Sequence, residues 1–324
     1  MSIVRAGAGR VNFFSSDAFL FSVAKVGFPG RPHGLEVVEV DGSRFRLLKV
    51  ANQYVVRWPF LDFFEPLPEP GDAHSSLSYL PVVSRRVLRA EEWKPEMATE
   101  EVQPAPFVDW SCFSSWEEFQ KRLRERPGYR PYSPQDTQRR RRKVEREIGS
   151  LRFTLHDSSP SVFERCLRWK SGQYVATGLK DLFAERRNVE LFRELHSRDL
   201  LTVSTLHAGD RLGAVHIGVV FDKRFYSWVP AYDPDLQQYA VGRLLLEELL
   251  AYSHRSGHAQ FDFIVGGESY KFCYATHVRV VEPAGKPPVA LVAARAAKRR
   301  VKSVLVRVPF LWQWTEPLRR ALRR

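Results

Sequence analysis

The sequence has few cysteines, few asparagines and no long uncharged run. Its three cysteines, Cys112, Cys166 and Cys273, form no CxxC pair and are too few for a disulfide framework, which favours a reducing compartment and no metal site. None of the three asparagines begins an N-glycosylation sequon. No stretch reaches the roughly 20 apolar residues of a membrane span, and the N-terminus lacks the apolar core of a signal peptide. We therefore expect a cytoplasmic protein.

Positive charge is concentrated at the C-terminus. The chain has 324 residues and a formal net charge of +13. Residues 286–324 hold eleven Lys and Arg against one acid, a net of +10, so the first 285 residues carry only +3. Basic residues in this tail lie beside Phe310, Trp312 and Trp314. That composition is typical of an interfacial helix on an anionic membrane, and it fits as well a helix that docks on the folded body; nucleic-acid binding is the least favoured alternative.

The first hundred residues mix strand and helix patterns. Alternating or β-branched runs predict strands at 35–40, 45–50, 54–58 and 77–84, with a short further element at 85–92. Prolines at positions 95, 104 and 106 then indicate a boundary near residue 108.

The second half changes from helices to strands. Helices are predicted over 115–126 and 135–148 and in two or three pieces over 161–197, with a short strand at 151–155. From residue 200 the order is β-β-β-α-β-α-β, with strands at 200–207, 212–221, 224–231, 260–265 and 277–282 and helices at 238–256 and 269–274. An antiparallel meander that leads into a βαβ crossover predicts a mixed sheet with helices on its faces.

The turn from Ala231 into the next helix is the first candidate site. The start of a helix presents free N–H groups and the positive end of the dipole, and it binds phosphate without special side chains. Here Val241 and Gly242 open the helix, Gly242 allows a ligand to approach closely, and Arg243 adds a positive charge. A single Gly at such a junction is common, so the turn alone specifies no ligand.

Several segments resemble the CelD/BcsL branch of the GNAT superfamily. They begin at Gly213, Phe225, Ala231, Val241 and Phe261 and read Gly-Ala-Val-His-Ile-Gly, Phe-Tyr-Ser-Trp, Ala-Tyr-Asp-Pro, Val-Gly-Arg-Leu-Leu-Leu and Phe-Asp-Phe-Ile-Val-Gly-Gly-Glu-Ser-Tyr-Lys. The most specific part is Asp-Phe-x-x-Gly-x-x-x-Tyr-Lys, from Asp262 to Lys271. The resemblance covers about residues 108–282. Where the family usually has Pro-Gly this chain has Val241-Gly242, so coenzyme A is implied by the resemblance and not by the loop.

The resemblance implies an α/β fold of GNAT type, a mixed sheet flanked by helices, in two tandem halves like those of FemAB proteins. We expect a degenerate N-terminal half at 1–108, a catalytic domain at 109–285 and a basic amphipathic tail at 286–324. The implied reaction is direct attack of an amine on the thioester of an acyl-CoA co-substrate, without a permanently bound cofactor. The expected acceptor is an amine of a lipid or envelope saccharide, and the protein would lie on the inner face of the cytoplasmic membrane.

Candidate catalytic residues follow from that reaction. His216 has an ordinary pKa near 6.5 and is a candidate base, although it fits equally a residue packed on the sheet. Tyr232 and Asp233 can position the amine, protonate the leaving thiolate or simply form a turn. Asp262 lies in an apolar strand and needs a partner, for which Lys271 is the candidate; a structural pair and a role for Lys271 on the carbonyl both remain open.

The expected coenzyme A contacts are Val241, Gly242, Arg243 and Tyr270, and Glu268 is expected to line the same pocket. Two other functions fit the same sequence. One is an aminoacyl-tRNA-dependent transferase like FemX. The other is a GNAT shell without catalysis that serves as an accessory factor in envelope polysaccharide or lipid assembly.

Overall fold

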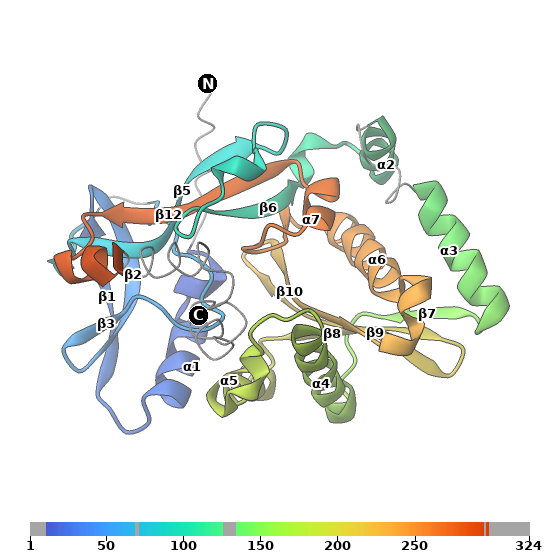
Figure 1. Ribbon diagram of the computed structural model, residues 1–324, viewed down its shortest axis with the longest axis horizontal. Helices are drawn as coiled ribbons and strands as arrows, with labels where there is room; N and C mark the ends of the chain where they lie inside the picture. The colour runs from blue at the N-terminus through green and yellow to red at the C-terminus, as the bar shows by residue number, and fades with distance from the viewer. Residues whose placement is uncertain (1–10, 69–70, 126–133, 295, 298–324) are drawn as a thin grey trace, which may run out of the picture.

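The computed structural model describes residues 11–68, 71–125, 134–294 and 296–297 (Figure 1). The expected mixed α/β architecture is confirmed: the structure has two sheets, and helices cover both faces of the larger one. In the part that is described, no helix combines the length and the apolar character that a membrane crossing requires.

The N-terminal part forms a small sheet beside one helix. Ser16 caps this helix, and its Oγ accepts a hydrogen bond from the Phe19 N–H at 3.3 Å. Phe19, Leu20 and Val23 face the core at helical spacing. The strand order is β3-β2-β1-β4, and the elements are η1 (Phe13–Ser15), α1 (Asp17–Gly27), β1 (His33–Val40), β2 (Ser43–Val50), β3 (Gln53–Val55) and β4 (Ser75–Ser76).

The large sheet has eight strands in the order β5-β12-β6-β11-β10-β9-β8-β7. Its strands are β5 (Tyr79–Arg89), β6 (Gln103–Asp109), β7 (Leu151–Thr154), β8 (Thr202–Ala208), β9 (Arg211–Phe221), β10 (Arg224–Tyr232), β11 (Gln260–Asp262) and β12 (His277–Gly285). Neighbouring strands are antiparallel, except that β10 and β11 run parallel over only three residue pairs, from Arg224–Gln260 to Tyr226–Asp262. The two strands therefore separate just beyond Tyr226.

Helices cover the two faces of the β8–β10 region differently. Helices α4 (Pro160–Ala176) and α5 (Arg186–Ser197) lie on one face, and α6 (Val241–Arg255) lies on the other with α2 (Trp116–Glu125) and α3 (Pro134–Glu147) outside it (Figure 1). Alternation along β9 explains both layers, because Val215 and Ile217 pack on the α4 side while Ala214 packs on the α6 side. Helix α7 (Ser269–Tyr274) connects β11 to β12, and its predicted bounds are confirmed.

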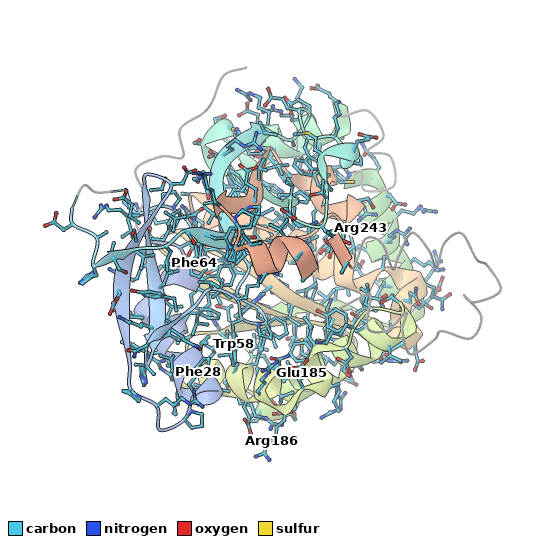
Figure 2. The ribbon with its side chains drawn as sticks, turned by 60° about the vertical axis from the view of Figure 1, so that its left-hand side comes forward. Phe28, Trp58, Phe64, Glu185, Arg186 and Arg243 are labelled. Carbon is cyan, nitrogen blue, oxygen red and sulfur yellow. The ribbon has the colours of Figure 1, made fainter. Side chains whose placement is uncertain are left out.

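Aromatic side chains join the N-terminal part to β10. The register of β10 shifts between Ser227 and Val229, which makes Trp228 the extra residue of a β-bulge. Its ring centroid lies 4.8–6.1 Å from those of Phe13, Phe14, Phe19, Phe60 and Phe192. At the edge of this cluster Trp58 packs on Phe28 with centroids 5.4 Å apart, next to the start of α5 (Figure 2). The N-terminal segment therefore packs against β10, the strand that separates from β11.

One expectation for the N-terminal region was wrong. The separate elements at 77–84 and 85–92 form one strand, β5. The prolines near the expected boundary lie in residues 103–109, which form β6 in the interior of the large sheet. The carbonyls of Pro104 and Pro106 accept hydrogen bonds from Gly266 and Phe263, so the missing proline N–H groups do not leave the strand without partners.

The large sheet continues across residue 108, because β5 and β6 pair with β12 and β11. The division into 1–108 and 109–285 stays a prediction. The expectations for the basic tail fall mostly on residues 295 and 298–324, which lie outside the described residues.

Candidate active site

A cavity of about 510 Å³ occupies the space where β10 leaves β11, and we call it the α6 cavity. The residues that start α6 form one wall, the β9–β10 surface another, and α7 with the preceding turn a third. His216, Tyr232 and Tyr270 line it, together with Val241, Gly242 and Arg243. The structure thus brings six of the predicted site residues to one cavity.

A second cavity of about 690 Å³, the Asp62 cavity, lies on the side of the N-terminal segment. Phe60 and Asp62 come from that segment, Tyr174 from α4, and Lys271 from α7. The two cavities share a wall, which we call the junction, and its residues are Lys170, Gln173, Ser227, Pro230, Tyr232, Gln237, Glu268 and Tyr270. Two ligands that enter from opposite sides would meet there.

The start of α6 is open to the α6 cavity. Ala240 precedes it in the left-handed conformation (φ 55°) and makes no side-chain cap. The N–H of Arg243 donates to the carbonyl of Ala240 at 3.0 Å, whereas the N–H groups of Val241 and Gly242 have no backbone partner among the described residues. A Cβ on Gly242 would lie 3.2 Å from Cδ1 of Tyr232, so the absent side chain lets the Tyr232 ring pack against the helix start.

Arg243 is less available to an anion than its position suggests. Its Nη1 lies 2.7 Å from Asp136 on α3, and its Nε lies 3.6 Å from Glu247. Its side chain is only 10% exposed. Protein carboxylates therefore already balance most of its charge, and the helix start remains the stronger feature for phosphate.

His216 is buried on β9, and its Nε2 lies 2.8 Å from the Ser227 Oγ. Gly218 leaves room for the ring, since a Cβ there would lie 2.8 Å from the His216 Cε1. Burial, aided by the positive charge of Lys170, lowers the pKa of His216 to about 3. The ordinary pKa that made His216 a candidate base does not apply, and its imidazole is neutral at physiological pH.

This low pKa predicts how stability depends on pH. The pKa of His216 is lower in the folded state than in the unfolded chain. The neutral imidazole therefore contributes its full stabilisation to the folded state above pH 6.5. This stabilisation is lost as the pH falls, because the unfolded chain takes up the proton first. We expect the loss to reach about 3 kcal/mol at pH 4 and to disappear in His216→Gln. Urea denaturation at pH 7 and pH 4 measures it, with exposed His33→Gln as control. Equal pH slopes in the two variants would contradict the assignment.

The predicted pair between Asp262 and Lys271 is wrong. Asp262 pairs with Arg279 at 2.7 Å, and Lys271 pairs with Glu268 at 3.0 Å and donates to the carbonyl of Val265 at 3.1 Å. Arg279 reaches Asp262 from β12 across β6, with its guanidinium 3.9 Å from the Phe107 ring centroid. Spacing along the chain could not reveal this partner, because Arg279 lies on β12, which pairs with β5 and β6 and not with β11.

Asp262 also shapes the turn that carries the motif. Its Oδ1 accepts a hydrogen bond from the N–H of Ile264 at 2.8 Å, and Ile264 has a left-handed φ of 55°. Gly266 follows with φ 152°, and a Cβ there would collide with the ends of Glu268 and Lys271. The spacing Asp-Phe-x-x-Gly therefore builds a tight turn that places Glu268 and Lys271 on the cavity walls, while Asp262 itself lines neither cavity.

Asp233 has the turn role that was the alternative in the sequence. Its side chain accepts from the Asp235 N–H at 3.1 Å and caps η6 (Pro234–Tyr239). It also pairs with Arg211 at 2.7 Å. It lines neither cavity, whereas Tyr232 beside it lines both.

Sequence reasoning missed Asp62. This carboxyl faces the cavity that bears its name, and its Oδ2 is shielded from solvent with no hydrogen-bond partner among the described residues. Burial raises the pKa of Asp62 to about 7, with the nearby Asp262 and Glu268 charges raising it and Lys271 opposing them. One sequence signal existed, because Asp62 is the single charge within Phe60-Leu-Asp-Phe-Phe64.

Lys170, on α4, lines both cavities. Its Nζ lies 5.1 Å from the Tyr174 ring centroid, and burial lowers the pKa of Lys170. Among the described residues it has no ion-pair partner. A cation at the junction is thus available to a ligand.

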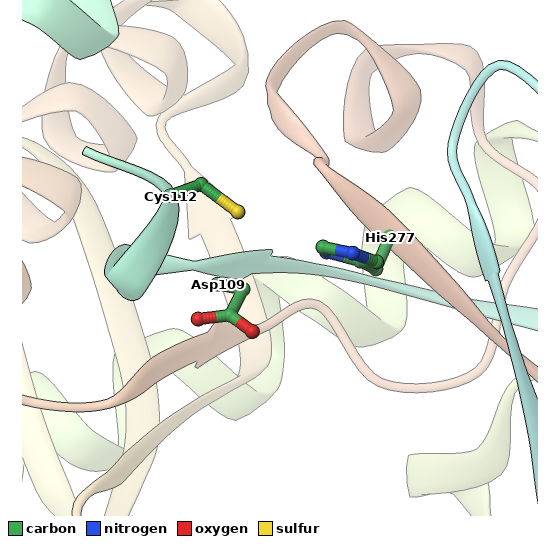
Figure 3. A group of neighbouring side chains, drawn as sticks. All are labelled: Asp109, Cys112 and His277. Carbon is green, nitrogen blue, oxygen red and sulfur yellow. The ribbon is translucent and has the colours of Figure 1, made fainter. Parts of the chain in front are cut away.

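Asp109, Cys112 and His277 form a separate group, with one potential ligand atom from each within 4.8 Å of the others (Figure 3). Asp109 already caps η3 (Trp110–Cys112) through Ser111, and three ligands fall short of the four of a structural zinc site. None of the three lines either cavity.

Charged residues are also buried beside the Asp62 cavity. Glu65 pairs with Arg224 at 2.7 Å and with Arg279 at 3.0 Å, and Arg279 continues to Asp262. This buried charge network joins the N-terminal segment to β10, β11 and β12. It fixes the place at which β10 and β11 separate.

Residues 134–272 match the family model for an acetyltransferase (GNAT) domain. This GNAT domain contains the β9–β10 surface, α6 and the turn that carries Glu268 and Lys271. It does not include Asp62, which the N-terminal segment supplies. No curated protein sequence matches the chain.

Solved structures agree on the fold. FemX aligns with a TM-score of 0.50 at 7% identity over 88% of this chain and 92% of that one. L-PGS from Bacillus licheniformis aligns at 0.45 and 12% identity over 93% and 97% of the two chains. The C-terminal domain (DUF2156) of a putative lysylphosphatidylglycerol synthetase from Agrobacterium fabrum aligns at 0.42 and 11% over 72% and 73%. The likeness to FemX, at 7% identity, shows a GNAT-like fold alone, and the CelD/BcsL branch stays a prediction.

Proposed function

We propose that the protein transfers an acyl group from coenzyme A to an amine at the junction of the two cavities. The observation that carries this proposal is the shared wall, because the eight junction residues line both the α6 cavity and the Asp62 cavity. One cavity suits a donor with a phosphate, and the other suits an acceptor with a positive charge. The GNAT match over residues 134–272 supports the same reaction class.

The donor would bind along the α6 cavity. Its pyrophosphate would accept hydrogen bonds from the free N–H groups of Val241 and Gly242 at the positive end of α6. Tyr270 and the apolar side chains Leu245 and Leu249 line the remaining wall and can hold the rest of the donor. The thioester would then reach the junction beside Ser227.

The acyl carbonyl would develop negative charge as the amine attacks. The ammonium group of Lys170 lies at the junction, and the β10 bulge begins there at Ser227, so both can stabilise that charge. His216 is neutral and holds Ser227 in place. Tyr232 borders both ligands, and Lys271 with Glu268 forms the opposite wall.

Binding of coenzyme A tests the donor assignment. We expect calorimetry to show binding to the wild-type protein, weakened at least about tenfold in Gly242→Val, whose branched side chain would push Tyr232 from the helix start. Gly34→Val is the control, because a Cβ there contacts nothing within 4 Å. If the wild-type protein did not bind coenzyme A, the donor assignment would be wrong.

The same sample distinguishes the rival functions. Transfer of a labelled amino acid from aminoacyl-tRNA, without coenzyme A binding, would indicate a FemX-like reaction. Binding of neither donor would indicate an accessory factor. A lipid or envelope saccharide as the acceptor, and a place on the inner membrane face, belong to the proposal.

A further inference from the structure

The Asp62 cavity has a charged interior and an apolar lining. Its charged groups are Asp62, Lys170, Glu268 and Lys271, and its apolar and aromatic lining includes Phe60, Tyr174, Leu179, Leu182, Trp228 and Ile264. Lys271 and Glu268 pair with each other at 3.0 Å, so they largely cancel. The groups without an ion-pair partner among the described residues are Asp62 and, at the junction, Lys170.

Asp62 is held ready for a ligand. A buried carboxylate oxygen without a hydrogen bond is costly, and folded proteins rarely keep one without a use. The charges that act on it are Lys271, Asp262 and Glu268, and the phenol of Tyr174 lies on the α4 wall of the same cavity. Asp262 and Lys271 have closer partners of their own. A cationic ligand would supply the partner that Asp62 Oδ2 lacks among the described residues.

Two apolar side chains are exposed at the α4 side of this cavity. Leu179, which lines the cavity, is 62% exposed, and Val175, four residues before it, is 68% exposed. Scattered exposed apolar residues are ordinary, but Leu179 continues the apolar lining outward from Phe60 and Leu182. A ligand with a charged end at Asp62 would thus leave the cavity over apolar surface.

We propose that the Asp62 cavity binds an amphiphilic primary amine, with its ammonium group on Asp62 and its apolar body directed past Leu179. This inference rests on the proposed function, for which it names the acceptor class and an amine-binding residue outside the GNAT domain match. A sugar amine, polar on every side, does not suit that exit.

Asp62 can also accept the first proton that the amine must lose before it attacks. It takes one proton from the ammonium group and returns it to water, which leaves a neutral amine. The amine nitrogen then forms a bond to the acyl carbon, the carbon–sulfur bond breaks, and the second nitrogen-bound proton goes to the thiolate. The products are an amide, free coenzyme A and one released proton.

Binding of octylamine and ethanolamine to the full chain, measured by calorimetry without any donor, tests the inference. We expect octylamine to bind at least about 100-fold more tightly, because its apolar chain is buried. Since octylamine stays cationic from pH 5.5 to 8, we expect its affinity to fall as the pH drops through about 7 and Asp62 takes up its own proton. Asp62→Asn should lower the affinity at pH 8 at least tenfold and remove the pH dependence.

Controls separate binding from folding. Asp72→Asn, an exposed acid of the same N-terminal segment, should change neither affinity nor pH dependence. Asp62→Asn should melt no lower than the wild type at pH 8, because it removes a buried charge. Leu179→Ser should reduce the preference for octylamine over ethanolamine about tenfold and leave ethanolamine binding unchanged.

The outcomes distinguish the two proposals. Octylamine binding that survives Asp62→Asn with its pH dependence intact would overturn the inference, as would the absence of octylamine binding or equal binding of both amines. Coenzyme A binding is measured separately, so its loss would defeat the donor assignment while the amine result still stands or falls by itself.

Discussion

Replacing Arg279 with methionine is expected to lower the free energy of unfolding by about 3–5 kcal/mol. Arg279 is 3% exposed and balances both Glu65 and Asp262. Without it, Asp262 would be buried without its ion-pair partner. Burial already raises the pKa of this carboxyl. Urea denaturation at pH 7 measures the loss.

The matched control is Arg86→Met. Arg86 pairs with Glu282 at 2.8 Å in the same sheet, but its side chain is 43% exposed. We expect a cost of at most about 1 kcal/mol there. Adding Asp262→Asn to Arg279→Met should recover part of the stability, because no unpaired charge is then buried. Similar costs for Arg279→Met and Arg86→Met would show that the network contributes little.

The second large effect concerns Lys170. Lys170→Met keeps the apolar stem and removes the ammonium group from the junction, so we expect acyl transfer to lose about 10²- to 10³-fold in kcat/KM. Binding of coenzyme A should change little, because the start of α6 is untouched. Steady-state kinetics with an acyl-CoA and the preferred amine measure kcat/KM, and calorimetry measures the binding of coenzyme A.

Arg168→Met tests whether any lost cation on α4 has this effect. Arg168 is exposed and lies outside both cavities, and its replacement should leave kcat/KM unchanged. If Lys170→Met retained wild-type activity, the carbonyl would have to be stabilised by the β10 bulge alone. The assignment of Lys170 would then be wrong, while the location of the two cavities would stand.

Sequence patterns predicted the second half of the chain well, because its elements are locally encoded. The β-β-β-α-β-α-β order from residue 200 is confirmed, since alternating strands and an amphipathic α6 reveal themselves within a short window. The first half was harder to predict. Pro104 and Pro106 resemble a linker, yet they lie in β6 between β11 and β12, where their carbonyls find partners far along the chain.

Predictions for site residues were correct where the contacts of the residue are local in sequence. Val241, Gly242, Tyr232 and Tyr270 line the cavities, as their positions at strand ends and helix starts imply. His216 lines one as well, but its burial, and with it its low pKa, could not be read from a single strand. The predicted partner of Asp262 was wrong for the same reason.

The sequence by itself determined the strand and helix order of the second half, the turn at Gly266 and the open start of α6. These features depend on periodicity, on a glycine with positive φ and on helix geometry, all of which act over a few residues. Only the tertiary structure decided that β10 and β11 separate, that Arg279 balances Asp262, and that Asp62 lines a cavity from outside the GNAT domain match. Burial and charge pairing depend on segments more than 200 residues apart, such as Glu65 and Arg279. The α6 cavity is thus implied by local sequence, whereas the Asp62 cavity exists only because the N-terminal segment packs against it.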